Sequence, residues 1–135
     1  MIYQILIRVL SPMVLLLSLM DGLKRKAEKT FVLKRLGFFI PNLEPQSNRV
    51  WVHCASVGEV KAAEPLLNWM IQSNQTNVIV TTNTASGLSI LNRQFGTQLT
   101  ATYCPLDYPF AIRRFLKQCR PAELFIIETE IWPNL

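Results

Sequence analysis

From residue 50 onward, short apolar runs alternate with amphipathic segments along the chain. The apolar runs cover residues 50–55, 77–82, 99–104 and 123–127. Runs of this length, bounded by polar turns, are typical of strands that are buried on both faces of a parallel sheet. The pattern therefore predicts strands that alternate with helices.

The segment after the first predicted strand places its apolar residues on one helical face. With i, i+3, i+4 spacing, they are Ala63, Leu66, Leu67, Met70 and Ile71. Pro65 lies within this segment, and a proline inside a helix removes a backbone hydrogen bond. We therefore expect either a kink or a late start of the helix.

Two further amphipathic segments predict two more helices. The first turns Leu88, Leu91 and Phe95 inward and ends at Gly96. The second is expected to end before Pro121, to expose Arg113, Arg114 and Lys117, and to bury Phe110, Ile112, Phe115, Leu116 and Cys119.

The predicted strands begin about every 25 residues, which suits successive right-handed βαβ units. We therefore predict an α/β fold over residues 49–135, with a Rossmann-like parallel sheet and flanking helices. Sheets of this kind bind ligands at the carboxyl ends of their strands.

The first twenty residues predict a membrane-anchoring hydrophobic helix that is not cleaved off as a signal peptide. Fifteen of them are apolar, but the longest uncharged run, residues 9–20, has only twelve residues, and a bilayer span needs about 20. The stretch could cross the bilayer with Arg8 reaching the headgroups, or lie in the interface with a bend near Pro12. No small-x-small cleavage pattern precedes Asp21, which argues against a signal peptide.

Residues 21–48 form a basic juxtamembrane segment and linker. The net charge is +5, and residues 1–49 hold the whole excess. The clustered basic side chains are Lys24, Arg25, Lys26, Lys29, Lys34 and Arg35. This concentration favours anionic membrane lipids as the partner over a nucleic acid, and the positive-inside bias predicts a folded part on the cytoplasmic side. The alternative is a solvated helix face without a lipid role.

Composition limits the fold and the chemistry. A chain of 135 residues with 50% hydrophobic and 17% charged residues is one domain's worth of protein, which excludes a complete two-domain enzyme and a disordered tail. Cys54, Cys104 and Cys119 fit neither a disulfide framework nor a metal knuckle, so we expect reduced core thiols. His53 is interpreted as a packing residue, and no metal or cofactor is expected.

The turns that follow the four predicted strands should share one edge of the sheet. They carry Gly58 and Glu59, then Ser86 and Gly87, then Asp107, and finally Glu128 and Glu130. Four of the six acids after residue 49 thus fall on this edge. No Gly-x-Gly-x-x-Gly or Gly-Lys-Ser/Thr motif follows a strand, which argues against dinucleotide and P-loop chemistry. The two glycines allow close backbone approach at helix starts.

Glu59 is the candidate catalytic residue at this edge. An ionised carboxylate in a crevice can take a proton from an attacking hydroxyl, which is the work of a general base. The alternative is an ordinary acid in a first helical turn, where such residues are common and stabilise the helix.

Five ordered motifs resemble one enzyme family. They are Trp-Val-His-Cys-Ala-Ser-Val-Gly-Glu at 51–59, Thr-Thr-Asn-Thr-Ala-Ser-Gly at 81–87, Tyr-Cys-Pro-Leu-Asp at 103–107, Arg-Arg-Phe-Leu at 113–116 and Glu-Thr-Glu-Ile-Trp-Pro-Asn-Leu at 128–135. Together they resemble the N-terminal half of the 3-deoxy-D-manno-octulosonic acid (Kdo) transferases, which are inverting glycosyltransferases of the GT-B fold. The resemblance includes the hydrophobic start and Arg35-Leu36-Gly37.

The resemblance implies an activity and roles for the residues of the edge. The family moves Kdo from CMP-Kdo to a hydroxyl of lipid A precursor at the inner membrane of Gram-negative bacteria, in lipopolysaccharide core biosynthesis. Glu59 would be the general base toward the acceptor hydroxyl, and Glu128 and Glu130 would shape the crevice. Contacts to the acceptor or the sugar are implied for Gly58, Ser86 and Gly87.

The chain is shorter than the members of this family. They carry a second Rossmann-like domain that supplies most of the CMP-sugar site, so we expect the 135 residues to be inactive alone. A different hypothesis is a membrane-tethered module in which Asp107, Glu128 and Glu130 hold Mg²⁺ for a phosphate ligand. That hypothesis calls for adjacent acids after the first strand and a lysine after a fifth strand, and neither is present.

Overall fold

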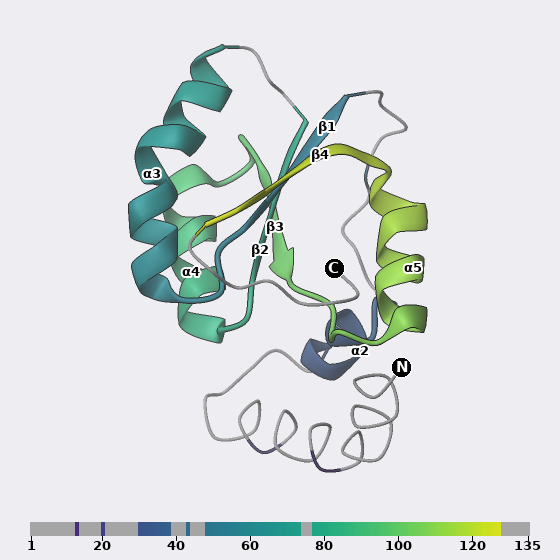
Figure 1. The fold of residues 1–135 in the computed structure, drawn as a ribbon. Helices are drawn as coiled ribbons and strands as arrows, with labels where there is room; N and C mark the ends of the chain where they lie inside the picture. The colour runs from purple at the N-terminus through teal and green to yellow at the C-terminus, as the bar shows by residue number, and fades with distance from the viewer. Residues whose placement is uncertain are drawn as a thin grey trace.

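The computed structural model describes residues 13, 20, 30–38, 43, 48–73 and 77–127. Figure 1 shows how the elements of this part are arranged around a sheet. In chain order they are α2 (Phe31–Arg35), β1 (Arg49–His53), α3 (Val57–Gln72), β2 (Val78–Thr82), α4 (Ala85–Phe95), β3 (Thr100–Tyr103), α5 (Pro109–Cys119) and β4 (Pro121–Ile126).

All neighbouring strands are parallel, and their order is β3-β2-β1-β4. The predicted α/β class with a parallel sheet and flanking helices is therefore confirmed. The chain moves outward from β1 through β2 to β3 and then returns to the other side of β1. The order thus reverses between β1 and β4, and a crevice at the carboxyl ends of such a pair is the usual ligand site of open α/β sheets.

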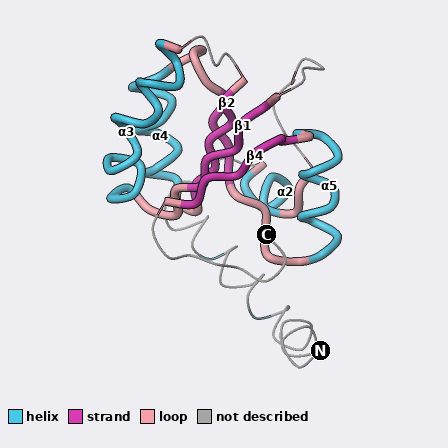
Figure 2. The backbone as a smooth tube through the Cα atoms, turned by 45° about the horizontal axis from the view of Figure 1, so that its top comes forward, coloured by secondary structure: helices cyan, strands magenta, loops and turns pink. Residues whose placement is uncertain are grey.

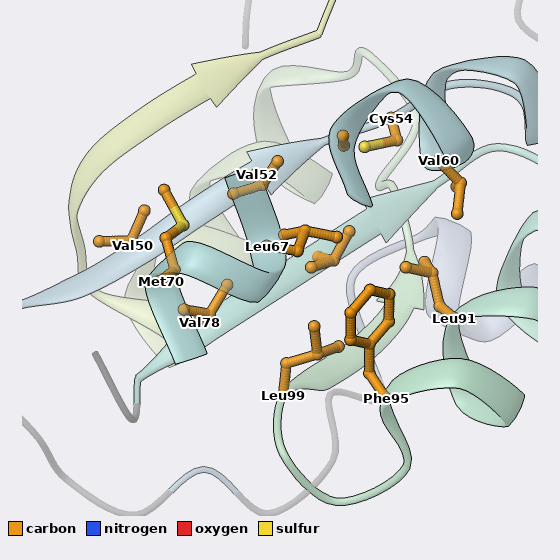
Figure 3. Packing of buried hydrophobic residues seen from close by; sticks show 12 residues of the cluster. Val50, Val52, Cys54, Val60, Leu67, Met70, Val78, Leu91, Phe95 and Leu99 are labelled. Atoms are coloured by element: carbon orange, nitrogen blue, oxygen red, sulfur yellow. The ribbon is translucent and has the colours of Figure 1, made fainter. Parts of the chain in front are cut away.

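One face of the sheet is covered by α3 and α4, as the two views show (Figures 1 and 2). Alternate residues of a strand point to opposite faces, so Val50 and Val52 of β1 face these helices. They pack with Leu67 of α3 and Leu91 of α4 in the main hydrophobic core (Figure 3).

The opposite face is covered by α5. Trp51 and Ile79 pack there against Phe115 and Cys119 of that helix. The rings of Trp51 and Phe115 lie 4.6 Å apart between centroids. Because both faces of β1 and β2 are covered, every residue of these two strands is buried, which explains their continuous apolar patterns.

The helix α3 begins at Val57 and runs through Pro65. The expected late start is therefore wrong. Ser56 caps the helix by accepting a hydrogen bond from the Glu59 backbone N–H, and a cap of this kind stabilises a helix by about 1 kcal/mol. Pro65 itself is exposed. Capping and the buried apolar face outweigh the single hydrogen bond that the proline removes.

Two residues of α5 differ from the prediction. Phe110 and Leu116 were expected to be buried, but they are 52% and 39% exposed. The buried face of the helix is instead formed by Ala111, Ile112, Phe115 and Cys119. Helical spacing puts Phe110 on the side of Arg113, Arg114 and Lys117, so its apolar character alone had suggested burial, and Leu116 lies at the border of the buried face. Arg120 ends the helix in the left-handed conformation, at φ 44°.

The hydrophobic pattern did not predict α2. Phe31 lies edge to face with Tyr103 of β3, at 4.6 Å between ring centroids, and it also packs with Leu88 of α4. The middle of the segment 21–48, which was expected to be a basic linker, thus packs against the folded sheet.

The described residues contain no helix that is both long and apolar enough to cross a membrane. Apart from Met13 and Met20, the anchor expected at residues 1–20 lies outside them. It stays a prediction.

Candidate functional site

Glu59 lies in the first turn of α3, directly after the carboxyl end of β1. The backbone N–H of Ala55 donates to Oε2 of Glu59 at 2.6 Å, and the Ser56 hydroxyl donates to Oε1 at 2.9 Å. The Glu59 N–H donates to Ser56 Oγ in return, so the two residues hydrogen-bond reciprocally at the start of α3. The side chain is only 8% exposed, so its carboxylate is held in one position.

This carboxylate retains capacity for a further hydrogen bond. An ionised carboxylate offers about four lone-pair positions, and Ala55 and Ser56 occupy one on each oxygen of Glu59. The Glu59 carboxylate can therefore accept the proton of a hydroxyl group that reaches the sheet edge.

Gly58 is exposed beside Glu59. Among the described residues, a Cβ built on Gly58 would meet only Ser56 Oγ, at 3.7 Å. The packing of this part of the chain therefore does not require a glycine here. Open space at a helix N-terminus, next to a fixed carboxylate, is compatible with close approach of a ligand to the backbone.

At Gly87, in the first turn of α4, packing itself requires a glycine. Its N–H donates to Thr84 Oγ1 at 3.0 Å, and a Cβ on Gly87 would lie 2.5 Å from Thr82 Oγ1. The glycine thus lets α4 start close to β2. Ser86 beside it is exposed at the same edge of the sheet.

The carboxyl ends of β1 and β4 are adjacent. His53 is opposite Ile126 in the register, and the Ile127 N–H donates to the His53 carbonyl at 2.9 Å. Glu128 and Glu130 follow this point in the sequence but lie outside the described residues. Their place beside Glu59 therefore stays a prediction.

Arg35 is the residue of this edge that sequence reasoning did not single out for a role there. Its Nη1 donates to Asn83 Oδ1 at 2.6 Å and to the Cys104 carbonyl at 2.8 Å. The Leu106 N–H in turn donates to the Arg35 carbonyl at 2.7 Å. Arg35 thus ties α2 to the turns after β2 and β3. The available signal was the Arg35-Leu36-Gly37 motif, which lies too far from the strands in sequence to be paired with them by pattern.

The predicted packing roles of His53 and the cysteines are confirmed. His53 is fully buried, with Nδ1 at 2.9 Å from Thr81 Oγ1. The three cysteines are free and buried. Burial, and to a smaller extent the charge of Glu59, raise the pKa of the Cys54 thiol to about 12. Burial likewise raises the pKa of Cys119 to about 12.

No group of three or more His, Cys, Asp or Glu side chains that could hold a metal ion is found in the part of the chain described. Of the three acids in the Mg²⁺ hypothesis, only Asp107 lies there, and it is half-buried in the turn after β3.

A family profile and several curated proteins match this chain. The profile, described as 3-Deoxy-D-manno-octulosonic-acid transferase (kdotransferase), matches residues 31–135. It therefore starts with α2 and covers every strand and helix given above.

The curated relatives carry the same description. The 3-deoxy-D-manno-octulosonic acid transferase of Haemophilus influenzae is 33% identical over 134 residues, which are 98% of this chain and 31% of that protein. The protein of that name from Bordetella pertussis is 38% identical over 96 residues, which cover 67% of this chain and 22% of the relative.

A plant protein also matches. The probable 3-deoxy-D-manno-octulosonic acid transferase, mitochondrial, of Arabidopsis thaliana is 35% identical over 95 residues, 69% of this chain and 21% of that protein. The chain thus spans less than a third of the length of these relatives. By the profile match and these identities, the chain belongs to the 3-deoxy-D-manno-octulosonic-acid transferase (kdotransferase) family.

Proposed function

We propose that the chain is the N-terminal, acceptor-side part of an inverting glycosyltransferase of the GT-B fold. In this proposal the enzyme moves Kdo from CMP-Kdo to a hydroxyl of lipid A precursor, in lipopolysaccharide core biosynthesis. Membership of the family supports the reaction class. The observation that carries the assignment of this domain is the fixed Glu59 carboxylate at the carboxyl end of β1, beside the open backbone at Gly58.

Glu59 acts as the general base. The acceptor hydroxyl donates its proton to a Glu59 oxygen while its own oxygen attacks the anomeric carbon of Kdo. The bond from that carbon to the CMP phosphate breaks, and CMP leaves with the electron pair. Attack from the side opposite the leaving group inverts the anomeric centre, and the hydrogen bonds from Ala55 and Ser56 keep the base oriented throughout.

The other edge residues have supporting roles. Gly58 and the exposed Ser86 contact the acceptor or the sugar, while Gly87 acts through the close start of α4. Glu128 and Glu130 shape the crevice from the end of β4. Most of the CMP-sugar site belongs to a second domain, so the 135 residues alone have no transferase activity.

Localisation follows from the N-terminal third. The hydrophobic segment 1–20 and the basic residues that follow it hold the enzyme at the inner membrane, with the folded part on the cytoplasmic side. The lipid acceptor lies in the same bilayer, so tethering raises its effective concentration at the site.

The test is Glu59→Gln in a polypeptide that joins these 135 residues to the remaining portion of the Haemophilus influenzae relative. Glutamine can still accept from the Ala55 N–H and can donate to Ser56 Oγ, so the helix start is preserved. We expect kcat with CMP-Kdo and lipid acceptor to fall about 10²- to 10⁴-fold, with acceptor binding retained.

The matched control is Glu64→Gln, one turn further along α3, which should leave kcat unchanged. Unchanged turnover in Glu59→Gln would remove Glu59 from the role of base. Robust turnover by the 135 residues alone would contradict the need for a second domain.

A further inference from the structure

The outer side of α5 combines an aromatic residue with basic residues. Phe110, Arg113, Arg114 and Lys117 recur at i, i+3, i+4 and i+7, which places them on one helical face. The buried residues of the helix lie on its other side. Phe110 is 52% exposed, and Arg113 and Lys117 are exposed.

The segment after α2 extends this surface with a second aromatic ring. The Arg114 guanidinium lies 3.8 Å from the centroid of the Phe38 ring, and Arg114 Nη1 donates to the Leu36 carbonyl at 3.2 Å. Phe38 is nevertheless 48% exposed. We call Phe38, Phe110, Arg113, Arg114 and Lys117 together the α5 face.

No acidic residue is present in either α2 or α5. The acid nearest in sequence to the α5 face is Asp107, which is half-buried in the turn before α5. Other exposed apolar residues have a different setting, since Leu124 and Phe125 follow Glu123 on β4. Among the described surfaces, the α5 face pairs exposed aromatic rings with basic groups without an intervening acid.

We propose that the α5 face rests on an anionic phospholipid surface. Aromatic rings are favoured at the level of lipid headgroups, where a polar and an apolar environment meet. Basic side chains beside them gain attraction to the negative lipid surface. The inference goes beyond the proposed function because it assigns the contact to a surface of the folded domain and not to the N-terminal segment.

The contact would orient the candidate site. Phe110 lies in the first turn of α5, which follows the carboxyl end of β3, and α2 lies at the same end of the sheet (Figures 1 and 2). With the α5 face on the bilayer, the edge that carries Glu59 is held close to the lipid surface, where a lipid acceptor is presented.

Spin labels on the whole 135-residue chain test this contact. One label is placed by Phe110→Cys, and the control is placed by Trp69→Cys, since Trp69 is 60% exposed on α3 at the opposite face of the sheet. The three native cysteines are buried and do not compete for the reagent. The probe is a vesicle of phosphatidylglycerol and phosphatidylcholine.

We expect the label at position 110 to become several-fold more accessible to oxygen, relative to an aqueous nickel reagent, when the chain binds these vesicles. The label at position 69 should remain aqueous. If both labels stay aqueous while the chain is bound, the α5 face is not the contact. This result would not contradict the N-terminal anchor or the proposed transferase function.

Charge reversal provides a second test of the contact between the α5 face and the lipid surface. Arg113→Glu with Lys117→Glu should return the label at position 110 to water, whereas Lys61→Glu with Arg93→Glu, on α3 and α4, should not. Equal effects of the two pairs would show a response to net charge alone and would overturn the proposal. Contact of the label with pure phosphatidylcholine vesicles would also contradict it, because it would show that lipid charge is not required.

Discussion

At the scale of single residues, Gly58 and Gly87 differ in whether packing requires a glycine at that position. Both lie in first helical turns at the same sheet edge, and both are implicated in substrate contact by family resemblance. Only Gly87 is crowded, because a Cβ there would lie 2.5 Å from Thr82 Oγ1. Stability measurements can therefore separate the glycine required by packing from the glycine left for a ligand.

We predict that Gly87→Ala lowers the free energy of unfolding of the chain by about 1–3 kcal/mol, the usual cost of overpacking. Gly58→Ala should leave it unchanged or raise it by up to about 1 kcal/mol, because alanine is the better helix former. Urea unfolding followed by circular dichroism measures both. Similar losses in the two variants would show that Gly58 is also required by packing.

Cys54 gives a pH prediction. Its pKa is raised from 9.0 to about 12 in the folded chain, so below 9.0 both states keep the proton and stability is complete. As the pH rises through this interval, the unfolded thiol loses its proton while the folded one retains it. The free energy of unfolding should then fall by about 1.4 kcal/mol per pH unit on account of this thiol.

The measurement is urea unfolding of the reduced chain at several pH values within that interval. Cys54→Ala is the comparison, because every other titratable group is common to both proteins. Its stability should fall less steeply with pH than that of the unmodified chain. Parallel slopes would contradict the raised pKa of Cys54.

At the scale of elements, the alternation of apolar runs and amphipathic segments predicted the four strands and the helices α3, α4 and α5. The strands β1 and β2 are buried throughout, as such runs predict, whereas β4 is mostly exposed. The pattern could not predict α2, whose five residues are too few to show a helical period. Sequence also assigned Glu59 and the glycines to one edge, because the carboxyl ends of parallel strands meet there. Arg35 escaped the same reasoning because its contacts with Asn83 and Cys104 are long-range.

Arg35 should hold α2 in place. We predict that Arg35→Met lowers the free energy of unfolding by about 1.5–3 kcal/mol, the range for hydrogen bonds from a charged group. Hydrogen exchange at the Leu106 N–H, which donates to the Arg35 carbonyl, should accelerate by more than the global change explains. Such a difference would indicate local detachment of α2.

The control for this prediction is Arg93→Met on the exposed side of α4, which should change stability by less than about 0.5 kcal/mol. If Arg35→Met behaves like the control, the hydrogen bonds from Arg35 to Asn83 and Cys104 contribute no net stability.

At the scale of the whole molecule, β4 differs from the other strands. It pairs with β1 at the end of the strand order, and four of its six residues are exposed. Phe125 is opposite Val52 and Leu124 is opposite Trp51, so these neighbours lie on opposite faces of the sheet. Strands of parallel sheets are normally covered on both faces. The exposure of β4 therefore marks a surface that further structure would cover.

We predict that the 135 residues associate with one another through β4 and that Leu124→Lys with Phe125→Lys shifts them toward the monomer. Lysine on an edge strand opposes pairing with a second edge, because its charge would be brought against another chain. Sedimentation velocity measures the distribution of species.

The control is Trp69→Lys, which removes a single apolar residue that is more exposed than either Leu124 or Phe125. If Trp69→Lys dissociates the chain as well as the double variant does, general surface hydrophobicity drives association. If neither variant changes the distribution, the chains do not associate through β4.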